Sequence, residues 1–298
     1  MIAFKVFNDL ADAQRLWNEL SPRESIYDLW DFRECFYRHD VQPLHFYAAF
    51  EEDRPVALLP LQYNAPLGAY EFFAENFMEE NRPFVRPGYE YLIPRLFQAA
   101  PAVTKIYDLD GTDEFTRALP LEDYVYLLDI GRCHSFADYL QAFFPNAHKR
   151  SNFKRIFTVL ERDHAVKVHH NNFPDLELIM DLNVRHFGQE SYLRTPAERQ
   201  PFRDLLQLPL DWQLVTVEVD GEKLAASLAV IYRETYYYLI VGADISRVGD
   251  ALKYLTKANL DLALSRNLSI FNLSLGDCNW KNYWHPDRKP QYKFIKLA

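Results

Sequence analysis

The sequence predicts an α/β (α+β) protein with two tandem units, each a mixed, mostly antiparallel sheet flanked by helices. One observation behind this prediction is that helical periods alternate with strand-like runs along the 298 residues. Another is a faint internal repeat, in which a strand, an acidic turn and an Ala/Leu-rich strand occur twice, at 44–63 and 212–233. We therefore expect an N-terminal half at 1–134 and a C-terminal half at 135–298.

The N-terminal half begins with two predicted helices. Apolar residues at helical spacing favour helices at 9–20 and 25–38, and Ser25 is a good N-cap for the second. The segment at 64–87 has no clear period and is expected to be a long loop with short strand pieces, of the kind that often carries function. The remaining expected elements are a hairpin at 44–50 and 55–63, a helix at 94–100, and strands at 104–109 and 123–130.

The C-terminal half has a fuller pattern of elements. Ser135 caps a predicted helix that Pro145 ends, and a basic helix follows. The expected helices are 136–144, 146–163, 173–187, 196–208 and 249–266, and the expected strands are 165–170, 212–219, 223–233, 235–242 and 268–275.

Composition narrows the class of protein. Hydrophobic residues make up 49% of the chain, enough for a real core, and no apolar run is long enough for a membrane span. The N-terminus has no signal-peptide pattern, so we expect a cytoplasmic protein. Three widely spaced cysteines favour free thiols over a disulfide framework, and no metal-ligand spacing is found. The net charge of −9 disfavours nucleic acid except where basic residues gather.

A short turn at 247–249 lies between a predicted strand and a predicted helix. Such a turn can present backbone N–H groups and the positive end of a helix to a phosphate. A polar segment follows the next strand, Gly276-Asp277-Cys278-Asn279-Trp280-Lys281-Asn282-Tyr283-Trp284. This order of elements, with Gly276, Asp277 and Trp280-Lys281-x-x-Trp284, resembles the C-terminal half of duplicated GNAT-fold acyltransferases of the CelD/BcsL-like (cellulose-biosynthesis-type acetyltransferase) family, which is related to Fem aminoacyltransferases.

The resemblance implies an N-acyltransferase that moves an acyl group from acyl-CoA, or from an acyl carrier protein, to an amine of a small molecule or peptide. No metal is implied. A Fem-type enzyme that uses aminoacyl-tRNA is the alternative, and a non-catalytic binding protein is a third hypothesis. In this scheme the first half is a degenerate unit, and the second holds the acyl donor.

The resemblance assigns the acyl-donor site to the end of one strand and the turn that follows it. Asp250 would cap the helix but also places negative charge where a phosphate would bind, so an ordinary capped helix is an equal alternative. The assigned residues are Ile240, Gly242, Arg247, Val248, Gly249 and Asp250.

Three further residues are candidates for chemistry. Lys281 is expected to be held by Trp280 and Trp284 through cation–π contacts and aimed at the substrate, or else to be a lysine whose stem covers a tryptophan core. Asp277 could act as a general base, or could cap a helix. Tyr238, on the same strand face as Tyr236, could protonate the leaving thiolate, although sheet packing is the more ordinary role of such aromatics.

The basic helix at 146–163 is the last candidate. It carries six basic residues within fifteen positions, and one of them, Arg150, is assigned to substrate binding. A solvated helix face is the default interpretation of such a run, and an anion-binding face is the alternative.

Overall fold

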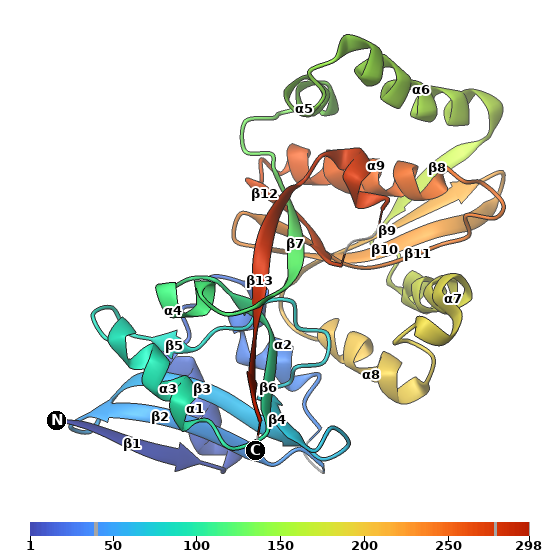
Figure 1. Cartoon of the computed structure of the whole chain (residues 1–298). Helices are drawn as coiled ribbons and strands as arrows, with labels where there is room; N and C mark the ends of the chain where they lie inside the picture. The colour runs from blue at the N-terminus through green and yellow to red at the C-terminus, as the bar shows by residue number, and fades with distance from the viewer. Residues whose placement is uncertain (39–40, 277–278, 298) are drawn as a thin grey trace. The chain divides into compact units, whose positions relative to one another are not determined.

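The structure is a computed structural model that describes residues 1–38, 41–276 and 279–297. The chain divides into two compact units (Figure 1). Unit 1 comprises Met1–Val125 and Lys289–Ala298, and unit 2 comprises Tyr126–Arg288. The expected halves, 1–134 and 135–298, differ from these units mainly because the last strand of the chain pairs with a strand of unit 1.

Unit 1 contains a mixed, mostly antiparallel sheet. Its strand order is β1-β2-β3-β4-β6-β13, with β5 paired to β3, and a short parallel contact joins β4 to β6. The strands are β1 (Ile2–Phe7), β2 (Leu44–Glu51), β3 (Arg54–Asn64), β4 (Ala69–Phe72), β5 (Phe84–Val85), β6 (Thr104–Asp110) and β13 (Asp287–Lys296). The helices are α1 (Leu10–Leu20), η1 (Ile26–Asp28), α2 (Trp30–Glu34), η2 (Glu90–Leu92), α3 (Ile93–Ala99) and α4 (Glu114–Arg117).

The sequence prediction for unit 1 needs three corrections. The expected helix at 25–38 is two short pieces, η1 and α2, because Leu29 between them is extended, although Ser25 caps η1 as predicted. The N-terminal residues form β1, an edge strand in which Lys5 is the one polar residue, so its sequence shows no alternation of polar and apolar positions. The charged segment at the C-terminus forms β13, which is antiparallel to β6.

Unit 2 contains the second sheet, in the order β7-β12-β11-β10-β9-β8. From β8 to β11 neighbouring strands are antiparallel, and β12 is parallel to β11. The strands are β7 (Leu121–Asp129), β8 (Val166–His170), β9 (Asp211–Val219), β10 (Glu222–Tyr232), β11 (Thr235–Ala243) and β12 (Ile270–Leu275). The expected fold class, sheets of this mixed kind flanked by helices, is confirmed.

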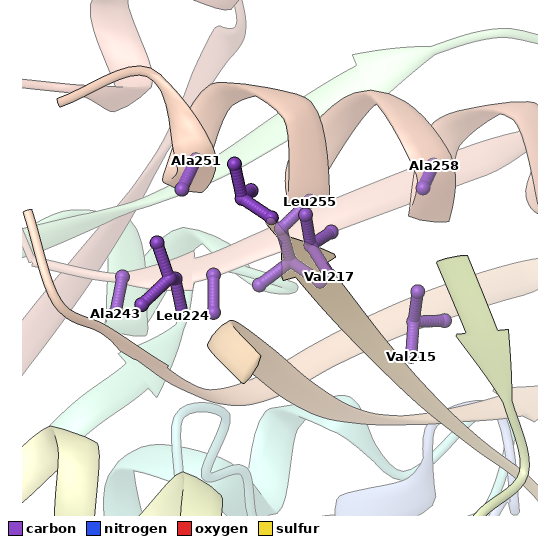
Figure 2. Packing of buried hydrophobic residues seen from close by; sticks show 9 residues of the cluster. Val215, Val217, Leu224, Ala243, Ala251, Leu255 and Ala258 are labelled. Atoms are coloured by element: carbon purple, nitrogen blue, oxygen red, sulfur yellow. The ribbon is translucent and has the colours of Figure 1, made fainter. Parts of the chain in front are cut away.

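Helices cover both faces of the second sheet (Figure 1). Side chains alternate along β11, so Gly242 faces α7 while Ala243 faces α9. An apolar cluster that includes Val217, Leu224 and Leu255 packs α9 onto the sheet (Figure 2). The helices of unit 2 are α5 (Phe136–Phe143), α6 (Ala147–Asp163), η3 (Phe173–Asp175), α7 (Leu176–Phe187), η4 (Gly188–Glu190), α8 (Pro196–Leu205), α9 (Ala251–Ser265) and η5 (Lys281–Trp284).

We predict that Gly242→Ala destabilises the protein by about 1–3 kcal/mol, because the backbone of α7 lies against the glycine. A Cβ atom there would be 2.5 Å from the Ile179 carbonyl oxygen and 2.9 Å from the Asn183 nitrogen. The free energy of unfolding from denaturant titration measures the effect. Gly131→Ala is the control, since its Cβ would lie at an ordinary 3.5 Å from Ser269. Equal losses for the two variants would contradict the prediction.

Candidate functional site

The candidate site lies where β11 and β12 stop pairing. Their parallel ladder joins Thr235 to Ile270 and ends with Tyr237 opposite Asn272. Both strands continue past this point, β11 to Ala243 and β12 to Leu275. Over their C-terminal parts the two strands are therefore not paired with each other, and in parallel α/β arrangements ligands bind at the carboxyl ends of strands.

Ser274 explains why β12 leaves the ladder. Its φ of 70° lies in the left-handed region, which a non-glycine residue rarely adopts. Its side-chain hydroxyl donates to the Tyr238 carbonyl at 2.8 Å, and its backbone N–H donates to the Asn272 side chain at 2.8 Å. A side chain thus replaces the next backbone bond of the ladder, and the strands separate after it.

The separated part of β11 presents backbone groups on its β12 side. Asp244 donates its N–H to Leu224 on β10, so by antiparallel alternation Val241 and Ala243 face the other way. The carbonyl of Val241 accepts a hydrogen bond from the Asn183 amide of α7 at 3.0 Å. In the part of the chain that the structure describes, the N–H groups of Val241 and Ala243 have no acceptor on that side, so this edge can pair with an extended ligand.

The start of α9 follows β11 after a short loop. Asp250 occupies the N-cap position but makes no capping hydrogen bond; its carboxylate pairs with Lys253 at 2.7 Å. The expectation that Asp250 caps this helix is therefore wrong, because its neighbour on the first turn takes the carboxylate. Among the described residues, the N–H groups of Leu252 and Lys253 have no acceptor, and such donors attract anions at a helix start.

The loop before α9 is ordered by its own side chains. Asp244 accepts from the Ser246 hydroxyl at 2.6 Å and from Arg185 of α7 at 3.2 Å. Arg247 is exposed and pairs with Glu222, so its guanidinium is at the surface beside the loop. Val248 packs against the apolar cluster beneath α9, and a Cβ atom on Gly249 would meet nothing within 4 Å.

Lys281 is buried and points into unit 2, not into bulk water. It is 3% exposed, and its ammonium donates to the carbonyls of Ser274 at 2.8 Å and Leu275 at 2.5 Å. It also lies 5.1 Å from the centre of the Tyr126 ring. Lys281 therefore holds the backbone of β12 just after the strand leaves the ladder, which is a positioning role for the site.

The two tryptophans beside Lys281 differ in their surroundings. Trp284 is fully buried and packs edge-on against Phe153 of α6, with ring centroids 5.2 Å apart. Trp280 is partly exposed and meets the ring of Tyr238 at 6.3 Å, at the level where the strands separate. Trp280 is thus the tryptophan of this pair that a ligand at the separated strands can contact.

Arg150 has a structural contact in this conformation. Its guanidinium donates to the carbonyls of Phe144 at 2.6 Å and Pro145 at 3.0 Å, just after α5. It therefore caps the end of α5, and its predicted role in substrate binding stays a prediction.

Tyr238 is the first residue of β11 beyond the ladder. It is 3% exposed, and its hydroxyl lies beneath α9 beside Ser227 and Thr256 without a hydrogen bond to any described residue. Burial raises the pKa of this hydroxyl, while the two neighbouring hydroxyls oppose the rise. The hydroxyl therefore stays protonated at neutral pH. Tyr236 lies on the same face, as predicted, and donates to Asn259 of α9.

Asp277, the predicted general base, lies outside the described residues. In the remaining residues, 1–38, 41–276 and 279–297, no group of three or more His, Cys, Asp or Glu side chains could hold a metal ion. No helix in these ranges is long and apolar enough to cross a membrane.

Comparison with known protein families gives a match within unit 2. Residues 147–282 match a family model described as an acetyltransferase (GNAT) domain, which spans α6 to β12 and the start of η5. No curated protein matches the chain.

Three solved structures have the same fold along the whole chain. FemX has a TM-score of 0.63 at 10% identity, over 99% of this chain and 97% of that chain. A tandem GNAT protein from the clavulanic acid biosynthesis pathway has a TM-score of 0.56 at 10% identity, over 99% and 98%. L-PGS from Bacillus licheniformis has a TM-score of 0.56 at 12% identity, over 97% and 92%. The fold is therefore GNAT-like, and the tandem neighbour supports a duplication.

Two residues of the site were missed by the sequence analysis. Ser274 looks like an ordinary strand residue, and its left-handed backbone cannot be read from sequence. Asn183 gave a signal, since it is a polar residue between apolar positions of α7; it is 3% exposed and its side chain accepts from Ser191. A buried amide in a helix needs partners, and here one of them is the edge of β11.

We predict that Lys281→Met lowers the free energy of unfolding by about 1–3 kcal/mol, because it leaves two carbonyls without their charged donor. Denaturant titration measures the loss. Lys154→Met is the control, since Lys154 is exposed on α6 and has no ion pair with any described residue. If Lys281→Met keeps full stability, the positioning role is wrong.

Proposed function

We propose that the protein is an N-acyltransferase that takes an acyl group from acyl-CoA, or from an acyl carrier protein, and gives it to an amine of a small molecule or peptide. The observation that carries the proposal is the separation of β11 from β12 beside the uncapped start of α9. The separated strands offer an unpaired edge of β11, and the start of α9 offers N–H donors without acceptors among the described residues. The pantetheine and diphosphate of one carrier need these two kinds of group next to each other.

The residues of unit 2 divide this task. The β12-facing backbone of Val241 and Ala243 would pair with the amides of pantetheine, and the predicted donor residues Ile240 and Gly242 are their neighbours along β11. The N–H groups at the start of α9 would bind the diphosphate, with Arg247 and the backbone of Val248 and Gly249 at its side.

The proposed reaction is a direct attack. The amine nitrogen forms a bond to the thioester carbonyl carbon, the carbon–sulfur bond breaks, and the electron pair leaves on sulfur. Tyr238 would give its proton to the sulfur, since its buried hydroxyl is protonated and unpartnered among the described residues. The proton lost by the amine would pass to Asp277. Lys281 would act through the backbone of β12, and Trp280 would contact the substrate.

Transfer from aminoacyl-tRNA is the second candidate function. The exposed face of α6 favours it, because Lys149, Lys154 and Arg155 have no ion pair with any residue described in the structure. Exposed cations on one helix suit the phosphates of RNA and give binding that weakens with salt. FemX has a similar fold, and at 10% identity this similarity supports the fold alone.

Binding experiments separate these functions. Calorimetric titration with acetyl-CoA and longer acyl-CoAs is expected to give saturable binding and a raised melting temperature. Binding of aminoacyl-tRNA alone, lost at high salt, would favour the second function. If no carrier binds, and Tyr238→Phe and Asp277→Asn change nothing measurable, the protein is a binding module without catalysis.

We predict that Asp250→Asn strengthens acyl-CoA binding about two- to fivefold, because it removes a negative charge at the start of α9 and releases Lys253. Calorimetry measures the dissociation constant. Asp261→Asn is the matched control. It removes the same charge from the same helix and likewise frees a lysine, Lys257, but it does so further along α9, away from the start of the helix. Weaker binding by Asp250→Asn would exclude this helix start as the diphosphate site.

A further inference from the structure

One face of the sheet in unit 1 carries a cluster of charged and polar side chains. Asn81 forms a bridge with Leu109 of β6, so Glu80 and Arg82 face the opposite side, together with Asp110. On the neighbouring strand, Gln291 lies directly opposite Asp110 in the register of β13 with β6. Cross-strand partners share a face, so these side chains form one group within unit 1.

The cations of this cluster already have partners. Arg82 pairs with Asp28 and Glu24, and Lys289 pairs with Asp110 at 2.8 Å. Glu80 is 3.7 Å from the Lys289 ammonium, and its carboxylate accepts no hydrogen bond from any residue that the structure describes. Lys289 is thus shared by two carboxylates, and Glu80 is the more distant of them and accepts no hydrogen bond from a described residue.

Gln291 is a second and independent sign of a missing partner. Its side chain is fully buried, yet neither its amide oxygen nor its amide nitrogen has a hydrogen-bond partner among the described residues. A buried unpaired amide destabilises the fold, and native proteins rarely keep one without a reason. The amide can accept one hydrogen bond from a ligand and donate another.

The titration of Glu80 agrees with an absent cation. Burial raises the pKa of this carboxyl to about 7; Asp110 adds to the rise, and Lys289 opposes it. An extra positive charge beside Glu80 would offset the burial and lower this pKa. The side chains of Glu80, 14% exposed, and Lys289, 35% exposed, connect the cluster to solvent.

We propose that Glu80 and Gln291 bind the ammonium group of a primary amine that carries a nearby hydroxyl or carbonyl oxygen. The ammonium donates to the Glu80 carboxylate and to the Gln291 amide oxygen, and the ligand oxygen accepts from the Gln291 amide nitrogen. Such a ligand supplies a positive charge beside Glu80 and the two hydrogen bonds that the Gln291 amide lacks. Amines are also the acceptors of the proposed acyl transfer, but this site rests on unit 1 residues and on binding alone.

Ethanolamine is the probe, because it has one ammonium and one hydroxyl. Ethanolamine is titrated into the full chain, and saturation-transfer NMR is expected to show saturable binding. Choline, which has no N–H donor, and ethylene glycol, which has no charge, should bind at least about tenfold more weakly. Ethanolamine binding should strengthen from pH 6 to pH 8, because Glu80 ionises over this range. The charged groups that act on Glu80 are Asp28, Arg82, Asp110 and Lys289.

Two variants test the two contacts. Glu80→Gln is expected to weaken ethanolamine binding about tenfold, whereas Glu52→Gln, the same charge change in the exposed β2–β3 turn, should leave it unchanged. Gln291→Leu should weaken binding about three- to tenfold without lowering the free energy of unfolding, because it removes an unpaired buried amide.

Stability measurements separate loss of binding from loss of fold. The pKa of Glu80 is raised in the folded protein, so its contribution to stability is present below pH 4.5 and is lost as the pH rises through about 7. Glu80→Gln should therefore be at least as stable as the wild type at pH 8. The proposal is overturned if ethanolamine does not saturate, if choline binds equally well, or if Gln291→Leu unfolds more easily and binds unchanged. None of these outcomes depends on whether unit 2 binds acyl-CoA.

Discussion

The site in unit 2 depends on the place where the β11–β12 ladder stops. Parallel strands that kept their full ladder would bury every backbone group of β11 against β12 and leave nothing for a ligand. Ser274 ends the pairing by turning its own backbone left-handed and bonding the Tyr238 carbonyl with its hydroxyl. Lys281 then holds the next two carbonyls of β12. A strained residue persists only where its surroundings hold it, and here those surroundings include a buried cation.

The electrostatics of the neighbouring loop set how strongly an anion could bind. The start of α9 has unpaired N–H donors, but Asp250 places a carboxylate beside them and Lys253 is occupied with that carboxylate. Arg247 is likewise paired with Glu222. An anion must therefore compete with two carboxylates for the nearby cations, and the favourable end of the helix is partly offset before any ligand arrives. The exposed cations Lys149, Lys154 and Arg155 on α6 have no such competition among the residues described.

Much of the fold could be predicted because its local signals agree with its packing. Periodicity and turn chemistry predict the hairpins at 44–63 and 212–233, the helix α9 and the capping role of Ser25. The GNAT-like order of elements in unit 2 was visible as a resemblance. The helix predicted at 25–38 was wrong for a tertiary reason. Arg33 is fully buried and donates to the carbonyls of Tyr27 and Phe73 and to the Asn81 side chain, which fixes the bend at Leu29.

The sequence alone determined which segments form strands and helices in unit 2, and that a strand, a loop and a helix meet beside a segment rich in tryptophan. Only the tertiary structure decided how these parts act. It turned Lys281 inward as a backbone donor, separated the roles of Trp280 and Trp284, and placed Gln291 opposite Asp110 across two strands distant in the chain. The physical reason is that periodicity encodes which face of an element is buried, whereas hydrogen-bond partners depend on residues that only folding brings together.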